Sequence, residues 1–112
     1  MEKLLDVLKA LSDETRLRIL NLLYEKELCV CDVMETLQIS QGKASRHLIA
    51  LKNAGLVKDR KHAQWAYYSM SKDGQLTFID SLVYDNLRNM EPYKKELENL
   101  KEWLKQNDGQ CN

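Results

Sequence analysis

Apolar residues recur at helical spacing along the first quarter of the chain. Two such runs are separated by Ser12 and Asp13, which are residue types that cap helix N-termini. The apolar positions are Leu4, Leu5, Leu8 and Leu11 in the first run, and Leu17, Leu20 and Leu23 in the second. The pattern predicts two short helices, each with one apolar face.

A third helix is expected over residues 30–37, and its start has two interpretations. Cys29 could cap it with Asp32 at the third helical position, or Asp32 could cap it with Glu35 at that position. In both cases Cys29 and Cys31 lie on either side of the helix start.

A fourth helix is expected to run to Ala54 with Ser40 as its cap, and Gly55 suits the left-handed residue that ends a helix. Its core face comprises Ala44, Leu48 and Leu51. Ile49 fits neither this face nor a polar one, because a helical wheel turns it away from the core positions.

The rest of the chain predicts a hairpin and two more helices. Residues 56–61 and 65–70 are rich in β-branched and aromatic side chains around a polar centre, which is typical of a two-stranded hairpin. A fifth helix is expected with Ser71 as its cap, and a sixth with Pro92 in its first turn. Their apolar residues are Leu76, Ile79, Leu82, Val83 and Leu87 in the fifth, and Tyr93, Leu97, Leu100 and Leu104 in the sixth.

Composition favours one mainly helical domain. The 112 residues are 44% hydrophobic and 30% charged, with four Gly and one Pro, which disfavours a disordered or fibrous chain. We expect a single domain over residues 1–106 and a polar, flexible tail over 107–112. No stretch approaches the roughly 20 apolar residues of a membrane span, and residues 1–10 are too charged for a signal peptide. A cytoplasmic protein without a membrane partner is therefore expected.

The charge is unevenly distributed although the formal net charge is zero. Residues 1–40 carry a net charge of −3, residues 41–62 carry +5, and residues 63–112 carry −2. A phosphate backbone responds to local charge rather than to the sum, so the middle segment is the candidate nucleic-acid surface. A solvated charged face is the alternative interpretation.

The third and fourth expected helices, joined by residues 38–40, match a helix-turn-helix. Only the first turns of a recognition helix lie deep in a major groove about 12 Å wide, so its polar and cationic residues must cluster there. The hairpin would then be a wing that contacts flanking phosphates. The candidate DNA-binding residues are Gln41, Gly42, Lys43, Ser45 and Arg46 on the helix, and Lys58, Arg60, Lys61 and His62 on the hairpin. An ordinary helical hairpin remains the alternative.

Two cysteines lie one short helix before this expected recognition helix. In a reducing compartment, an odd number of cysteines favours ligands, switches or packing over a disulfide framework. Cys29 and Cys31 therefore suggest a thiol-dependent sensor next to a DNA-binding module, with two buried structural thiols as the alternative. Within a regular helix, residues two apart point about 200° away from each other. We therefore expect that binding of one ion by both thiolates unwinds or re-aims the first turn of the third helix and disturbs the recognition helix.

Two segments resemble the ArsR/SmtB family of metal-responsive repressors. They are Ser-Gln-Gly-Lys-Ala-Ser-Arg-His-Leu at 40–48, continuing to 57, and Ala-Leu-Ser-Asp-Glu-Thr-Arg-Leu-Arg-Ile-Leu at 10–20. The resemblance covers about residues 8–70. It implies a winged helix-turn-helix homodimer, with dimerisation through the N- and C-terminal helices and an inverted-repeat operator as partner. Packing of these two helices within one chain is the alternative interpretation. His47 fits the family's recognition-helix pattern and joins the candidate DNA-binding residues.

The segment Leu-Cys-Val-Cys-Asp-Val at 28–33 resembles the signature of the arsenite-sensing branch. The resemblance implies that Cys29 and Cys31 bind As(III) or Sb(III) as the inducer, with no organic cofactor. Met34 stands where the signature often has a third cysteine, so Cys111 is either a third ligand or an idle terminal thiol. The hairpin tip, residues 62–64, also lacks the glycine that the family often has.

Other functions remain open. The same fold could sense cadmium, lead, thiol oxidation or a persulfide through the two cysteines. A winged helix that binds proteins rather than an operator is a further alternative. A thiol enzyme is disfavoured because no acid–base group accompanies the cysteines. A zinc site on the last two helices is disfavoured because residues 71–106 contain no His.

Overall fold

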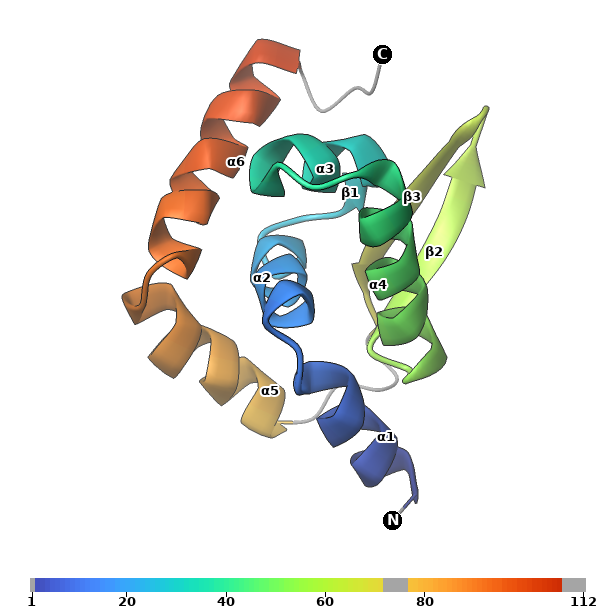
Figure 1. Ribbon diagram of the computed structural model, residues 1–112, viewed down its shortest axis with the longest axis vertical. Helices are drawn as coiled ribbons and strands as arrows, with labels where there is room; N and C mark the ends of the chain where they lie inside the picture. Colours follow the sequence, from blue (N-terminus) through green and yellow to red (C-terminus); the bar gives the residue numbers. More distant parts are fainter. Residues whose placement is uncertain (1, 72–76, 108–112) are drawn as a thin grey trace.

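The computed structural model describes residues 2–71 and 77–107, and within them a small antiparallel sheet lies at one edge of a mainly helical fold (Figure 1). The elements are α1 (Glu2–Leu11), α2 (Glu14–Leu23), β1 (Leu28–Cys29), α3 (Val30–Leu37), α4 (Gln41–Asn53), β2 (Val57–His62), β3 (Trp65–Met70), α5 (Thr77–Ser81), the π-helical turn η1 (Leu82–Asn86), the 3-10 turn η2 (Leu87–Asn89) and α6 (Tyr93–Asn107). The expected mainly helical fold with a β-hairpin is confirmed. None of the described helices has the length and apolar content that crossing a membrane requires.

The predicted helix ends are set by local contacts. The Asp13 carboxylate accepts a 3.1 Å hydrogen bond from the backbone N–H of Arg16, and the Ser40 hydroxyl accepts one of 3.1 Å from the N–H of Lys43. Gly55 follows α4 with a φ of 82°, the left-handed conformation that favours glycine. These caps confirm the starts of α2 and α4 and the end of α4.

The core forms around α2, which lies between α4 and α6 (Figure 1). Its side chains Ile19, Leu20 and Leu22 are fully buried. In the helix-turn-helix, α3 lies over one end of α2 and α4 runs beside α2, and α6 packs on both α2 and α3. The C-terminal helix is therefore part of the same core as the helix-turn-helix.

The sheet has a third strand that the sequence did not reveal. The strand order is β1-β3-β2, with Cys29 of β1 opposite Tyr67 of β3. A strand of two residues leaves no alternating pattern to read, so only the pairing with β3 identifies it. The β2–β3 turn closes at residues 63–64, where Ala63 takes a φ of 58° without a glycine. The wing thus forms despite its unusual tip.

The expected fifth helix is wrong as a single regular helix. Thr77 to Asn89 passes through α5, the wider turn η1 and the tighter turn η2. Ile79, Val83 and Leu87, four residues apart, are all buried, and a widened turn keeps that spacing on one face better than 3.6 residues per turn does. The cap at Ser71, Leu76 and the tail with Cys111 depend on segments outside the described residues.

The sixth helix agrees with the prediction. The backbone N–H of Glu96 bonds the carbonyl of Pro92 at 2.9 Å, so the proline stands at the first turn. Tyr93 and Leu100 are buried against the core, and Leu97 and Leu104 are half-buried on it. Much of the apolar face of α6 is therefore covered within the chain itself.

Candidate thiol site and nucleic-acid interface

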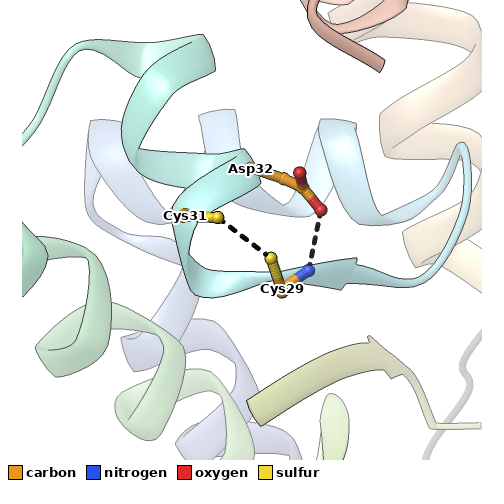
Figure 2. Close-up of side chains that lie close together, drawn as sticks. All are labelled: Cys29, Cys31 and Asp32. Atoms are coloured by element: carbon orange, nitrogen blue, oxygen red, sulfur yellow. Dashed lines mark hydrogen bonds between the residues drawn. The ribbon is translucent and has the colours of Figure 1, made fainter. Parts of the chain in front are cut away.

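The two cysteines converge at the junction of β1 and α3. Figure 2 shows their sulfur atoms facing each other, and the Sγ–Sγ distance is 3.3 Å. That distance is within hydrogen-bonding range for two thiols and longer than the about 2.05 Å of a covalent disulfide. Cys29 is buried with 1% of its surface exposed, and Cys31 is half-buried. The pair is thus preassembled, with one sulfur in reach of solvent.

The expectation that the thiols diverge is wrong because its premise fails. Cys29 lies outside the helix, as the N-cap of α3 with extended backbone angles of φ −88° and ψ 166°. The 100° rotation per residue therefore does not separate its side chain from that of Cys31. Two sulfurs at this spacing can bind one atom without unwinding the first turn of α3.

Asp32 settles the choice between the two capping interpretations. Its Oδ2 accepts a 2.9 Å hydrogen bond from the backbone N–H of Cys29, which makes Cys29 the cap and Asp32 the third helical residue. Its Oδ1 accepts a 2.7 Å hydrogen bond from the indole Nε1 of Trp103 on α6. Asp32 is 1% exposed, so one buried carboxylate ties the thiol junction to the C-terminal helix.

Cys29, Cys31 and Asp32 form the one group in the described part of the chain that could hold a metal ion, with donor atoms within 4.8 Å of each other. Both carboxylate oxygens of Asp32 already accept hydrogen bonds, so the donors best placed for a soft ion are the two sulfurs. Met34 is half-buried against the core beside them. Cys111 lies outside the described residues.

A cavity of about 390 Å³ opens beside the sulfurs, between α3, α4 and the wing. We call it the thiol cavity. Its walls include the two cysteines and Met34 on one side. The α4 and wing residues that line it include Gln41, Ser45, Ile49, Trp65, Ala66 and Tyr68. Ile49 is 47% exposed, and its position, which the sequence did not explain, is on the face of α4 that borders this cavity.

The predicted DNA-contacting residues of α4 lie at its N-terminal turns. Gln41, Gly42 and Arg46 are exposed, and Lys43 and Ser45 are half-buried. A Cβ at Gly42 would meet no atom within 4 Å, so the backbone there is open to approach from outside. The structure thus brings this part of the predicted set together on one helix end.

His47 differs from the other predicted residues because it is buried, with 7% of its surface exposed. Its Nδ1 accepts a 3.1 Å hydrogen bond from Nε of Arg16, whose Nη1 also donates to the carbonyl of Ala10 at 3.3 Å. His47 therefore joins α4 to α2 and to the end of α1. Its role at DNA remains a prediction, and this geometry favours an indirect one.

Stability should fall as the pH drops below about 6.5, the ordinary pKa of histidine. Burial is the largest effect on the pKa of His47 and lowers it. The Asp13 carboxylate raises this pKa and the Arg16 guanidinium lowers it, so the pKa is lowered overall. The unfolded chain then takes up this proton at a higher pH than the folded chain, so stability is full above about 6.5 and decreases as the pH falls toward the folded pKa. Between pH 7.5 and pH 5.5, the melting temperature should fall less for His47→Gln than for the unchanged protein. Equal losses would contradict this assignment.

The wing carries the remaining predicted residues. Lys58, Lys61 and His62 are exposed on β2. Arg60 donates two hydrogen bonds to Glu27, at 2.8 and 2.7 Å, and its guanidinium lies 4.9 Å from the centre of the Tyr67 ring. These contacts fix the wing against the residues that precede β1. Arg60, which was predicted to contact phosphate, is therefore paired with Glu27 in this structure.

Comparisons with known proteins agree with this architecture. Residues 13–59 match the family described as bacterial regulatory proteins, arsR family. Over 68 residues the chain is 50% identical to an arsenical resistance operon repressor of Escherichia coli K12, covering 60% of this chain and 58% of that protein. It is 48% identical over 68 residues to a cadmium resistance regulatory protein CadC homolog of Staphylococcus aureus, covering 60% and 56%.

A solved structure extends the similarity to most of the chain. The homodimeric winged helix-turn-helix domain Mb0332 of Mycobacterium bovis, a possible ArsR-family regulator, superimposes with a TM-score of 0.66 and 30% identity over 80% of this chain and 86% of that one. The matched segment spans 51% to 60% of the length of the first curated arsenic regulators. The helix-turn-helix, the wing and these similarities together show that the chain belongs to the arsR family of bacterial regulatory proteins.

Proposed function

We propose that this chain is a transcriptional repressor that leaves its operator when As(III) or Sb(III) binds the thiolates of Cys29 and Cys31. The observation that carries the proposal is the 3.3 Å separation of the two sulfurs beside the recognition helix. Two bonds of about 2.3 Å, a typical metal–sulfur length, span about 3.3 Å when they meet at a right angle. A trivalent pyramidal centre has bond angles close to that value, so the observed separation supports the proposal.

Binding a thiophilic centre requires both sulfurs to lose their protons. The inducer should therefore release protons as it binds, and its affinity should weaken as the pH falls. This pH dependence has a different origin from that of His47. It belongs to the binding of the inducer, whereas the effect of His47 belongs to folding.

The thiol junction is connected to both elements expected to contact DNA. Cys29 ends β1 and pairs with β3 of the wing, and α3, which begins at the next residue, packs on α4. A ligand held by both sulfurs therefore acts on the base of the wing and on the start of α3, where α3 packs on α4. Release of DNA requires a difference in ligand affinity between bound and free states of about 1–3 kcal/mol per coupled site.

The operator-bound form is proposed to be a homodimer on an inverted repeat. Three leucines on α1, Leu4, Leu5 and Leu8, are 40%, 50% and 47% exposed in the single chain. A dimer formed through the terminal helices would cover them. Two-fold symmetry then places two α4 helices in successive major grooves, about 34 Å apart. The proposed contacts are Gln41, Gly42, Lys43, Ser45, Arg46 and His47 from α4, and Lys58, Arg60, Lys61 and His62 from the wing.

Arg46→Ala should weaken operator binding by about tenfold or more, because each lost base or phosphate contact costs about 1–3 kcal/mol and the dimer loses two. Fluorescence anisotropy with labelled operator measures the change. The matched control is Lys101→Ala, which removes an exposed cation on α6 and should leave affinity within about twofold. Unchanged affinity in Arg46→Ala, or an affinity independent of salt, would favour a winged helix that binds proteins instead.

A second candidate keeps the fold and changes the signal. The similarity to a cadmium resistance regulator and the soft sulfur donors favour Cd²⁺ or Pb²⁺, and the close sulfurs also suit thiol oxidation or a persulfide. Operator release should be titrated with arsenite, antimonite, Cd²⁺, Pb²⁺ and a mild oxidant. Release at the lowest concentration by arsenite or antimonite supports the proposal, whereas release by oxidant without an arsenite response supports the redox alternative.

A further inference from the structure

An acidic side chain holds Arg60, the only arginine of the wing. Glu27 accepts a hydrogen bond on one carboxylate oxygen from Nε of Arg60 and on the other from Nη2, at 2.8 and 2.7 Å. Arginine binds a phosphate group through the same arrangement of two parallel bonds. This edge of the guanidinium is therefore closed to a phosphate while Glu27 holds it.

The pair lies in an accessible part of the wing. The side chains of Arg60 and Glu27 are 54% and 32% exposed. Lys58, two residues before Arg60 on the same strand, is also exposed and points to the same face of the sheet. A cavity of about 460 Å³ opens here, and its lining residues are Glu27, Lys58, Asp59, Arg60 and Ser69. A phosphate group can thus reach the guanidinium from solvent.

Glu27 is the carboxylate that meets such a phosphate with its negative charge in place. The hydrogen bond from Arg60 is the largest effect on the pKa of Glu27 and lowers it, and the charges of Lys58 and Lys26 lower it as well, against a smaller rise from burial. Asp59, the other acid at this cavity, is paired instead with Lys52 of α4 at 3.2 Å. The negative charge that opposes a phosphate at Arg60 therefore comes mainly from Glu27.

We propose that Glu27 is a built-in competitor of the DNA backbone for Arg60, so that this fork of the wing binds a phosphate only by displacing the carboxylate. The inference rests on the proposed function, because it takes Arg60 as a contact to DNA. A phosphate that replaces Glu27 exchanges one ion pair for another, so the contact yields little net affinity.

The consequence is a restraint on binding that does not depend on sequence. Contacts to phosphates fix the position of a protein on DNA but do not distinguish one base pair from another. Glu27 therefore weakens the attachment of the wing to every duplex alike. Discrimination of the operator is left to the N-terminal turns of α4, which can reach base edges in the major groove.

Two other roles for Glu27 make different predictions. A carboxylate that orients Arg60 toward DNA would support binding, so its loss would weaken the complex. A carboxylate that merely repels DNA at a distance would act whether or not residue 60 is an arginine. The sign of the change and its dependence on Arg60 therefore identify the role.

The test measures binding of the full chain to a labelled duplex of arbitrary sequence by fluorescence anisotropy. Glu27→Gln removes the charge and keeps the size of the side chain. It should tighten binding by about tenfold at about 50 mM salt, because in a dimer two wings gain a phosphate contact without displacing a carboxylate. The slope of log affinity against log salt should steepen by about one for each wing. Exposed ion pairs contribute little to folding, so thermal unfolding should be almost unchanged.

The matched control is Glu25→Gln. It makes the same change in net charge two residues earlier, at a carboxylate that pairs with Arg88 at 3.5 Å and not with the wing. Affinity for the duplex should stay within about twofold of the unchanged protein. A double-mutant cycle supplies the second control. Glu27→Gln should give no gain in an Arg60→Ala background, and Arg60→Ala should cost more affinity when residue 27 is already Gln.

The outcomes separate this inference from the proposed function. Weaker or unchanged binding in Glu27→Gln overturns the competitor role, and so does a gain that persists with Arg60→Ala or that Glu25→Gln reproduces. If arsenite still releases operator DNA in those cases, the proposed function stands. If neither the unchanged protein nor any variant binds a duplex, both proposals fail.

Discussion

Cys29→Ser and Cys31→Ser are each expected to abolish the response to arsenite while operator binding is retained. A trivalent centre bound by two thiolates loses half of its soft donors in either variant, and a neutral hydroxyl is a poor replacement. We expect the arsenite concentration for half-release to rise by about 5- to 150-fold, because the variant loses the about 1–3 kcal/mol that a coupled site contributes.

The retention of DNA binding follows from the position of the thiols. Neither sulfur belongs to the exposed N-terminal face of α4, and serine at the cap of α3 is a residue type that favours this position. Titration of labelled operator complexes with arsenite measures the response in each variant. Cys111→Ser is the comparison that tells whether the tail thiol takes part. A full response after loss of both Cys29 and Cys31 would end the proposed function.

Asp32→Ala is expected to lower the free energy of unfolding by about 3–6 kcal/mol, the sum for two hydrogen bonds to a charged group. The buried carboxylate satisfies two donors, the N–H of Cys29 at 2.9 Å and the indole of Trp103 at 2.7 Å, and both lose their acceptor in the variant. Hydrogen bonds to charged groups contribute about 1.5–3 kcal/mol each, and one of the two is the bond that caps α3.

Two further variants distinguish the contributions of the two hydrogen bonds of Asp32. Trp103→Phe removes only the indole donor and should cost less than Asp32→Ala, whereas Asp32→Asn keeps one acceptor and should lie between them. Glu35→Ala, an exposed acidic residue on the same helix, is the control and should change stability by less than about 0.5 kcal/mol. Urea unfolding followed by circular dichroism gives each value. A loss below about 0.5 kcal/mol in Asp32→Ala would show that the carboxylate does not tie α3 to α6.

Features that depend on neighbouring residues could be predicted from the sequence, whereas features that depend on distant residues could not. The caps at Asp13, Ser40 and Gly55 involve contacts across three or four residues, so their residue types identify them. The fifth helix was misjudged because its apolar spacing allows both a regular and a widened turn, and only packing against the core selects between them. Burial of His47 was missed because its partner, Arg16, stands 31 residues earlier in the chain.

The amino-acid sequence by itself determined the helix-turn-helix, the hairpin, the thiol pair at a helix start and the basic middle segment, because these depend on periodicity, capping and charge among neighbouring residues. Only the tertiary structure decided how the thiols meet the rest of the molecule. The pairing of β1 with β3, the link from Asp32 to Trp103 across 71 positions and the thiol cavity each join segments far apart in the chain. Such contacts are set by the packing of whole elements around α2, which no local pattern of residue types specifies.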